Sequence, residues 1–456
     1  MRDRFPLPST CEGGEEGDQV SHNGTVTYTG PAVDVLIMGA GLAGLVAAWQ
    51  AAAGGCRVRV VARGPGTLFW HAGCVDLLGY EASGAGEPIA APADALRRLI
   101  QDEPSHPYAR VGLEGVEAAL RALQELCEAA GYPLRGDVNR NWLLPSAAGA
   151  FRPTCLAPET MVAGDLARRD PLLIVGFEGM LDFYPELVAD NLAEQERPAR
   201  SVRLDLPALR ERRLLTPVTL ARLFERADFR RDVAEALRPK LGRAARVGFP
   251  AVLGLDRALE VKRDLETRLG REVFEIPALP PSVPGMRLHA ILVEAIRRAG
   301  GEVLTGMEVV RADVADGRVE AVFTEAAARL KPHRAHAFVL ATGGLLGGGI
   351  VADAEGRLRE VVLDLPVQGP EERLQWFRQD FLAPEGHPVY AAGLAVDGHF
   401  RPVDAGGAPI YANLFAAGTI LAGEDYLRRR SLDGVALATG YAVGRRVAHI
   451  VREAAA

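Results

Sequence analysis

Three glycines near the start of the chain have the spacing of a phosphate-binding turn. They are Gly39, Gly41 and Gly44, in the stretch "VDVLIMGAGLAGLVAAW". The branched apolar residues 33–38 before them are typical of a buried parallel strand, and the alanine-rich residues 45–53 after them are typical of a helix. In such a unit the first glycine makes the tight turn, the second admits a phosphate close to the backbone, and the third lets the helix pack on the strand. The free N–H groups at the helix start then bind the phosphate of a cofactor.

The second strand of this unit, residues 57–61, ends without the usual acidic residue. An acid there normally accepts hydrogen bonds from the ribose of the adenosine half of NAD or FAD, but this chain has Ala62 and Arg63. Arg63 fits an additional phosphate, as in NADP-binding proteins. FMN, which has no adenosine, fits equally, and in a third interpretation another residue holds the ribose. The sequence therefore predicts a phosphate-bearing cofactor and leaves its type open.

Few other residues have the pattern of a reactive site. His333 and His336 are three positions apart with no third ligand nearby, which favours a surface turn over a metal site. No pair for proton transfer is evident, and His71 is the candidate for a titrating group beside the cofactor. The cysteines include no CxxC pair, so we expect no metal and no iron–sulfur cluster on this chain. They are Cys11, Cys56, Cys74, Cys127 and Cys155.

The composition limits the classes of function. The 456 residues include 48% apolar and 24% charged side chains, as in an ordinary α/β protein. The net charge of −7 gives no support to nucleic-acid binding. No uninterrupted apolar run is long enough for a membrane span, and unpaired cysteines fit a reducing, cytosolic compartment. The acidic residues 1–30 are predicted to be a disordered extension that is not a secretory signal.

The order of the elements predicts how the domains are organised. We assign residues 31–133 and 285–456 to a Rossmann-like α/β domain that is built from both ends of the chain. Residues 134–284 are assigned to an inserted α+β cap domain, which ends in the Pro-rich linker "IPALPPSVPG".

Late elements of the chain are expected to return to the same cofactor. A strand, "AHAFVLATGG", ends in Thr342, Gly343 and Gly344. A second strand leads to Gly418, and a long apolar helix then begins near Asp433. A glycine-rich unit at the start followed by these elements is typical of the two-dinucleotide-binding flavoprotein fold.

Several stretches go beyond this general fold. "RGPGTLFWHAGCVDLLGY", "VGFPAVLGL", "ATGGLLGGGIVAD" and "NLFAAGTILAGEDY" resemble the B subunit of anaerobic glycerol-3-phosphate dehydrogenase, as do "GAGLAGLVAA" and the neutral residue at position 62. The resemblance covers about residues 32–450. The loop at residues 63–80 is its most specific part, since many flavoproteins share the glycine turn and the last helix.

The resemblance implies a subunit that binds FMN non-covalently. In this family an FAD-bearing A subunit is assigned the oxidation of glycerol 3-phosphate to dihydroxyacetone phosphate. A C subunit with iron–sulfur clusters docks the pair to the membrane and passes the electrons to quinone. The chain would then be cytoplasmic, held at the inner face of the cytoplasmic membrane through a partner, and would relay electrons through its flavin.

The resemblance also implies roles for individual residues. The glycine turn would hold the phosphate, Arg63 would contact phosphate or ribityl oxygens, and the backbone at 71–74 would face the isoalloxazine ring. The start of the last helix would lie near the pyrimidine oxygens of that ring. The cofactor-binding residues expected on this basis are Gly39, Ala40, Gly41, Leu42, Gly44, Arg63, His71, Gly73, Cys74, Thr342, Gly343, Gly344, Gly418, Asp433, Gly434 and Val435.

The chain departs from the family at two places and in its additional N-terminal extension, and other functions stay open. The loop is serine-rich in the family, where this chain has residues 71–74 as His-Ala-Gly-Cys. Arg428–Arg430 replace a glycine-rich run, and they face an acidic partner, a substrate phosphate or simply solvent. One alternative is a self-sufficient FAD-dependent dehydrogenase or reductase of a small hydroxy acid or double bond. Another is a non-catalytic assembly partner.

Overall fold

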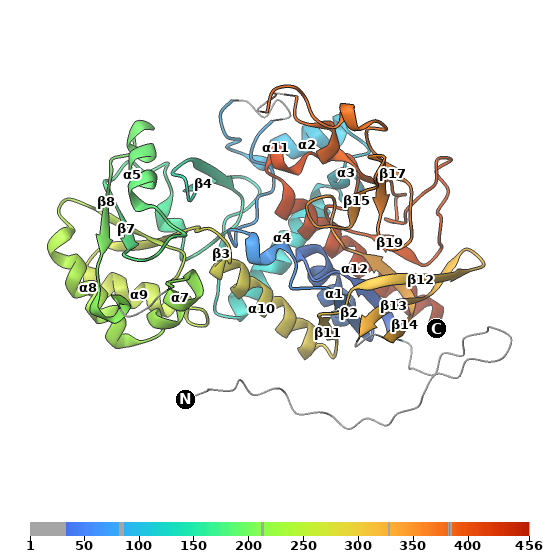
Figure 1. Cartoon of the computed structure of the whole chain (residues 1–456), viewed down its shortest axis with the longest axis horizontal. Helices are drawn as coiled ribbons and strands as arrows, with labels where there is room; N and C mark the ends of the chain where they lie inside the picture. Colours follow the sequence, from blue (N-terminus) through green and yellow to red (C-terminus); the bar gives the residue numbers. More distant parts are fainter. Residues whose placement is uncertain are drawn as a thin grey trace.

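The computed structural model describes residues 33–81, 86–210, 214–326, 329–381, 383 and 385–455. Its elements form two regions that lie beside each other in Figure 1. The middle of the chain, coloured green to yellow, builds the smaller region, and both ends of the chain build the larger one. The predicted disordered extension, residues 1–30, lies outside the described residues.

A seven-stranded sheet is the centre of the larger region. Its parallel part runs in the order β11, β2, β1, β14 and β19. Strand β13 pairs antiparallel with the first half of β14, and β12 pairs with β13. Early and late strands thus share one sheet, as the prediction of an α/β flavoprotein fold requires. The bounds are β1 (Val33–Met38), β2 (Val58–Ala62), β11 (Glu302–Thr305), β12 (Val309–Ala315), β13 (Arg318–Ala326), β14 (Arg329–Leu340) and β19 (Leu414–Ala416).

The first and last helices of the described chain pack closely on each other. They are α1 (Leu42–Ala53) and α12 (Leu432–Ala455). A Cβ atom at Gly440 of α12 would lie 2.5 Å from the carbonyl oxygen of Ala43, so only a hydrogen fits there. This close contact sets the start of α12 against the same edge of the sheet as the glycine turn.

Shorter elements surround this sheet or lie against the smaller region, as the strand at Trp142–Pro145 (β4) does in Figure 1. None of the helices in the described ranges is both long and apolar enough to cross a membrane. The elements are η1 (Thr67–Trp70), α2 (Pro92–Asp102), α3 (Pro107–Val111), α4 (Leu113–Ala129), β3 (Leu134–Arg135), β4 (Trp142–Pro145), β5 (Phe151–Thr154), β6 (Ala157–Pro158), η2 (Val162–Gly164), α10 (Val283–Arg298), β15 (Ile350–Ala352), β16 (Leu358–Glu360), β17 (Val367–Gln368), η4 (Arg373–Gln375), η5 (Pro388–Ala391), β18 (Gly393–Leu394) and α11 (Tyr426–Arg429).

The smaller region has its own sheet, in the order β10, β9, β7 and β8. All its strand pairs are parallel, because helices connect successive strands and carry the chain back to the same end. The predicted α+β cap, residues 134–284, thus contains this parallel sheet together with the antiparallel pairs β3–β6 and β4–β5, and its bounds remain a prediction. The elements are β7 (Leu172–Phe177), α5 (Pro185–Glu194), β8 (Ala199–Leu204), α6 (Pro207–Arg210), α7 (Pro217–Phe224), α8 (Ala227–Leu237), η3 (Arg238–Lys240), β9 (Arg246–Pro250), α9 (Ala258–Leu269) and β10 (Glu272–Ile276).

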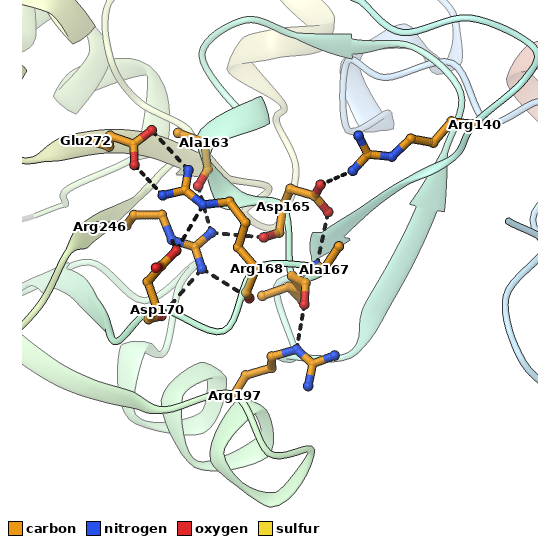
Figure 2. Close-up of polar contacts among 10 residues, drawn as sticks. Arg140, Ala163, Asp165, Ala167, Arg168, Asp170, Arg197, Arg246 and Glu272 are labelled. Atoms are coloured by element: carbon orange, nitrogen blue, oxygen red, sulfur yellow. Dashed lines mark hydrogen bonds and ion pairs between the residues drawn. The ribbon is translucent and has the colours of Figure 1, made fainter.

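A buried arginine holds the loop that leads into this sheet (Figure 2). Arg246 on β9 is fully buried, and its Nη1 donates to the carbonyl oxygens of Ala163 and Asp165 at 2.9 Å each. In the same loop, Arg168 donates to both carboxylate oxygens of Glu272 at 3.0 and 2.5 Å. The two guanidinium groups donate to backbone carbonyl oxygens and to a neighbouring carboxylate. They therefore hold the loop before β7, here called the cap loop, in place.

A second buried arginine ties the two regions together. Arg287 on α10 and Glu275 on β10 are both buried, and two hydrogen bonds of 2.7 and 2.9 Å join them. Arg287 also donates to the carbonyl oxygen of Gly254, which follows β9, at 2.6 and 2.9 Å. The guanidinium therefore links the larger region to two strands of the cap sheet.

Replacing Glu275 by glutamine should destabilise the protein strongly. The change leaves the charge of Arg287 buried without its partner, which costs about 3–5 kcal/mol. Urea denaturation followed by circular dichroism measures the loss. As a control, Glu186→Gln breaks a partly exposed pair with Arg203 and should change the free energy of unfolding by at most about 1 kcal/mol. Equal effects of the two substitutions would show that the buried pair has no special role.

Candidate functional site

A cavity of about 750 Å³ opens where the parallel strands of the larger sheet end. In open α/β sheets, this edge is where ligands bind. The wall of the cavity is formed by the segments that follow β1, β2, β11, β14 and β19, together with η1 and the start of α12. The elements from the two ends of the chain therefore meet in one site.

Two glycines of the turn after β1 are fixed by close backbone contacts. Gly39 has φ +116°, and a Cβ atom there would lie 2.2 Å from the carbonyl oxygen of Ala341. A Cβ atom at Gly44 would lie 2.0 Å from the carbonyl oxygen of Gly39. These glycines let the turn, α1 and the end of β14 approach one another, while Gly44 itself does not line the cavity.

Gly41 differs from the other two, because its open side faces free space. It lines the cavity together with Ala40 and Leu42, and a Cβ atom there would meet only the Oγ1 of Thr67, at 3.9 Å. Gly41 is also the N-cap of α1 and makes no side-chain cap. The first N–H groups of α1 are thus left for an anionic ligand, as the glycine spacing predicts.

At the tip of β2, the cavity wall has no acid on the strand itself. Ala62 is buried in the wall, and the side chain of Arg63 is 80% exposed at its edge. Glu308, which follows β11, also lines the cavity and lies 3.7 Å from the guanidinium of Arg63. Among the described residues that line the cavity, Glu308 is the one carboxylate.

The opposite side of the cavity is formed beyond β14 and β19. Thr342, Gly343 and Gly418 line it, as the resemblance implies. Gly344 lies outside the wall, and its N–H donates to the Oγ1 of Thr419 at 3.2 Å. Three of the four expected residues in these two turns therefore reach the cavity.

His71 follows η1 and lies in the cavity wall, where it forms an ion pair with Asp433. Its Nδ1 is 2.6 Å from the carboxylate of Asp433, and the side chains are 9% and 6% exposed. Arg152 on β5 lies behind Asp433 at 3.8 Å and donates to Asp76 at 2.6 Å. Four charged groups from distant parts of the sequence thus form one buried chain that ends at the cavity.

The pKa values of this cluster favour the charged pair. Burial by itself lowers the pKa of His71, but Asp433 outweighs it and raises that pKa above the ordinary value. Burial would raise the pKa of Asp433, whereas His71 and then Arg152 hold it below its usual range. The contacts therefore favour the protonated form of His71 and the ionised form of Asp433.

The two residues after His71 in the expected set lie behind the wall. Gly73 has φ +77°, and a Cβ atom there would lie 2.4 Å from that of Pro284. The Sγ of Cys74 is buried 3.6 Å from the Sδ of Met161, and burial raises the pKa of its thiol to about 12. Neither residue lines the cavity, and Cys74 is an inert packing thiol.

The start of α12 reaches the cavity through other residues than those expected. Gly434 donates its N–H to the carbonyl oxygen of Asp76 at 3.0 Å, and Val435 is buried. Neither they nor Asp433 line the cavity, whereas Leu432 and Ala436 do. Asp433 acts on the cavity only through His71.

One residue of the arginine run before α12, Arg429, makes contacts inside the protein. Arg429 is 2.9 Å from Glu424 and also pairs with Glu103. Glu424, itself buried, is 2.7 Å from the Nε2 of His106. Arg429 is therefore part of a buried network that fixes the segment before α12, and it does not face a partner.

Two polar atoms of the wall have no partner within the described parts of the chain. They are the Nε2 of His71 and the Oγ1 of Thr342, and both are buried. A buried polar atom without a hydrogen bond costs free energy, so such atoms call for an explanation. Both residues line the cavity, so a polar ligand there would explain these unpaired atoms, and the open cradle at Gly41 leaves room for its phosphate. The residues present therefore fit a phosphate-bearing cofactor.

Sequence reasoning missed Glu308 and the His71–Asp433 pair. Glu308 follows a parallel strand, a position that signals the ligand edge of such a sheet. His71 and Asp433 come from opposite ends of the chain, and their spacing carries no signal. Thr67 at the glycine turn and Tyr426 on α11 also line the cavity without having been predicted.

Comparisons with known proteins show the family to which the chain belongs. Residues 34–431 match the family described as FAD binding domain. The chain is 36% identical over 433 residues to the probable B subunit of anaerobic glycerol-3-phosphate dehydrogenase from Halobacterium salinarum, covering 92% of this chain and 99% of that protein. The chain belongs to this B-subunit family.

Other matches extend over similar lengths. The B subunit of anaerobic glycerol-3-phosphate dehydrogenase from Pectobacterium atrosepticum is 35% identical over 421 residues, covering 91% of this chain and 98% of that protein. Among solved structures, 3-ketosteroid-delta4-(5alpha)-dehydrogenase from Rhodococcus jostii RHA1 has a TM-score of 0.39 at 14% identity, covering 95% and 99% of the two chains.

Membership in the B-subunit family confirms the resemblance seen in the sequence. The protein is a flavin-dependent oxidoreductase with a Rossmann-like flavin-binding fold. The names of these relatives describe each of them as one subunit of an enzyme.

Proposed function

We propose that this chain relays electrons through FMN within a quinone-linked anaerobic glycerol-3-phosphate dehydrogenase. An FAD-bearing subunit oxidises glycerol 3-phosphate to dihydroxyacetone phosphate, and a subunit with iron–sulfur clusters passes the electrons to quinone. That cluster-bearing subunit holds the complex at the inner face of the cytoplasmic membrane. A bound flavin supplies the two-electron carrier, and this chain binds it, orients it and shields it from water.

The observation that carries the choice of FMN is the wall at the tip of β2. Ala62 is buried where an acid would accept hydrogen bonds from an adenosine ribose. An alanine side chain offers no acceptor, so this position gives an adenosine no polar contact. The cradle at Gly41 needs only the single phosphate of FMN.

The charges of the cavity support a relay. Glycerol 3-phosphate carries a dianionic phosphate, which proteins hold with arginine or lysine. Among the residues that line the cavity, the basic ones are Arg63 and His71. Arg63 lies beside Glu308 at the β2 end, and His71 is paired with Asp433. With Arg63 at the exposed edge and the Nδ1 of His71 held by Asp433, the described wall has no cluster of basic groups for a second phosphate beside the flavin, which favours a partner as the site of substrate oxidation.

The flavin released from the purified protein should be FMN. Acid extraction followed by chromatography against FMN and FAD standards identifies it, and the protein concentration gives the stoichiometry. One FMN per chain is the expected result. Recovery of one FAD per chain would contradict the choice of FMN.

A second candidate is a self-sufficient FAD-dependent dehydrogenase, and Glu308 is the observation that favours it. Its carboxylate lines the cavity next to Ala62 and is placed to accept hydrogen bonds in place of the missing acid. If this candidate is correct, Glu308→Gln lowers the amount of FAD retained on purification. Under the FMN proposal the same substitution leaves flavin content unchanged.

A further inference from the structure

The buried charge cluster ends at an atom for which the fold supplies no partner. His71 lines the cavity, its Nδ1 is held by Asp433 at 2.6 Å, and its Nε2 is buried without a hydrogen bond. A buried N–H or ring nitrogen in this state is costly, yet Asp433, Arg152 and Asp76 keep the ring in this position. A ligand that accepts a hydrogen bond from this Nε2 would explain why the fold leaves the atom without a partner.

We propose that His71, held by Asp433, donates a charge-assisted hydrogen bond from Nε2 to the bound flavin and stabilises the reduced flavin. In this role His71 contacts the cofactor, and Asp433 is a positioning residue that fixes the ring and its charge. No proton leaves His71 in this proposal, since its cation acts by its field and its hydrogen bond.

The order of the strands indicates which part of the flavin reaches His71. The glycine turn after β1 is the phosphate cradle, and β2 and β11 lie on one side of it. On the other side are β14 and β19, with α11 beside them, since a Cβ atom at Gly344 would lie 3.3 Å from the hydroxyl of Tyr426. His71 binds the first turn of α12, which directly follows α11. His71 therefore lies at the end of the cavity away from Ala62. If the adenosine side of a flavin points toward Ala62, the isoalloxazine ring lies at the end where His71 is.

The charges that face His71 set the sign of its pH dependence. Asp433 and Asp76 raise the pKa of His71, and Arg152 opposes them. Because the pKa of His71 is raised, its cation is fully present below the ordinary value of about 6.5. The cation is lost as the pH rises through the raised pKa of His71. Stabilisation of the reduced flavin therefore holds at low pH and fades at higher pH.

The test is the reduction equilibrium of the flavin-loaded protein, measured against a reference dye at a series of pH values. At pH about 6, His71→Gln should shift this equilibrium toward the oxidised flavin by roughly ten- to a hundredfold, the value of a charge-assisted hydrogen bond. Well above the raised pKa, wild type and variant should coincide. The extra pH dependence of the wild type should be absent from the variant.

The matched control is His289→Gln. The ring of His289 packs on that of Phe69 in η1, with the ring centroids 5.2 Å apart. Its Nε2 is also buried without a partner in the described chain, but His289 does not line the cavity. We expect wild-type behaviour from this variant. If His71→Gln matches the wild type at every pH, or if both variants shift equally, the proposal is wrong.

A measurement on the wild type keeps the proposal testable if His71→Gln does not fold. In protein labelled with nitrogen-15 histidine, the Nε2 resonance of His71 should move between the oxidised and reduced flavin-loaded states. Asp433→Asn, which lowers the pKa of His71, serves to assign it. An Nε2 resonance that stays constant would overturn the contact. The inference holds for FMN and FAD alike, so its failure would leave the relay proposal standing.

Discussion

Replacing Gly41 by valine should remove the flavin from the protein and leave its fold intact. The backbone of Gly41 has φ −75° and ψ 178°, an extended conformation that valine adopts readily. In the protein itself a Cβ atom there meets only the Oγ1 of Thr67, at 3.9 Å. With a phosphate in the cradle, the side chain takes the space of the phosphate and separates it from the N–H groups of α1. Losing two such hydrogen bonds lowers the affinity by roughly a hundredfold or more.

Flavin content and fold are measured separately for this variant. Visible absorbance reports the bound flavin after purification, and circular dichroism reports the helices and strands. Gly398→Val is the control, because a Cβ atom there has open space on all sides and Gly398 does not line the cavity. A Gly41→Val protein that is yellow and fully loaded would show that the glycine has no role in phosphate binding.

The general fold could be predicted because its signals are local. The glycine turn lies between a buried strand and a helix, and the structure has β1 and α1 at those positions. The late strand that ends before Thr342 is β14, which pairs directly with β1. Each of these units has a characteristic residue pattern of its own, so the prediction needed no knowledge of tertiary contacts.

The strand pairing within the inserted segment was harder to predict. The mixture of strands and helices predicts an α+β cap, and in the structure the antiparallel pair of β4 and β5 accompanies a sheet in which β7 pairs with β8 and β9 in parallel. Pairing direction depends on how each helix packs across the sheet, and the residue pattern of a single strand does not record it. The buried Arg246, which fixes the cap loop through backbone carbonyls, carries no signal in the sequence either.

The site was predictable where the backbone makes it and hidden where side chains meet across the fold. Gly39, Gly41 and Gly418 were predictable because turns at strand ends need glycine. Asp433 was expected to contact the flavin through the helix N-terminus, whereas its carboxylate is bound to His71. Such a contact depends on two side chains that only the completed fold brings together.

Glycerol 3-phosphate should leave the flavin of the isolated chain oxidised. The described residues that line the cavity include no cluster of basic groups for the phosphate of the substrate. In the proposed relay, the FAD-bearing subunit takes the hydride of the substrate and passes on the electrons, so adding that subunit should change this outcome. With that subunit present, the absorbance of the flavin in this chain should bleach.

Anaerobic mixing with glycerol 3-phosphate, with and without the FAD-bearing subunit, tests the relay most directly. The absorbance of the flavin bands is followed by stopped flow, and dithionite gives the fully reduced reference. The relay predicts no bleaching of the isolated chain and nearly complete bleaching once the FAD-bearing subunit is added. Rapid bleaching of the isolated chain by glycerol 3-phosphate alone would contradict the relay and make this chain the catalytic subunit.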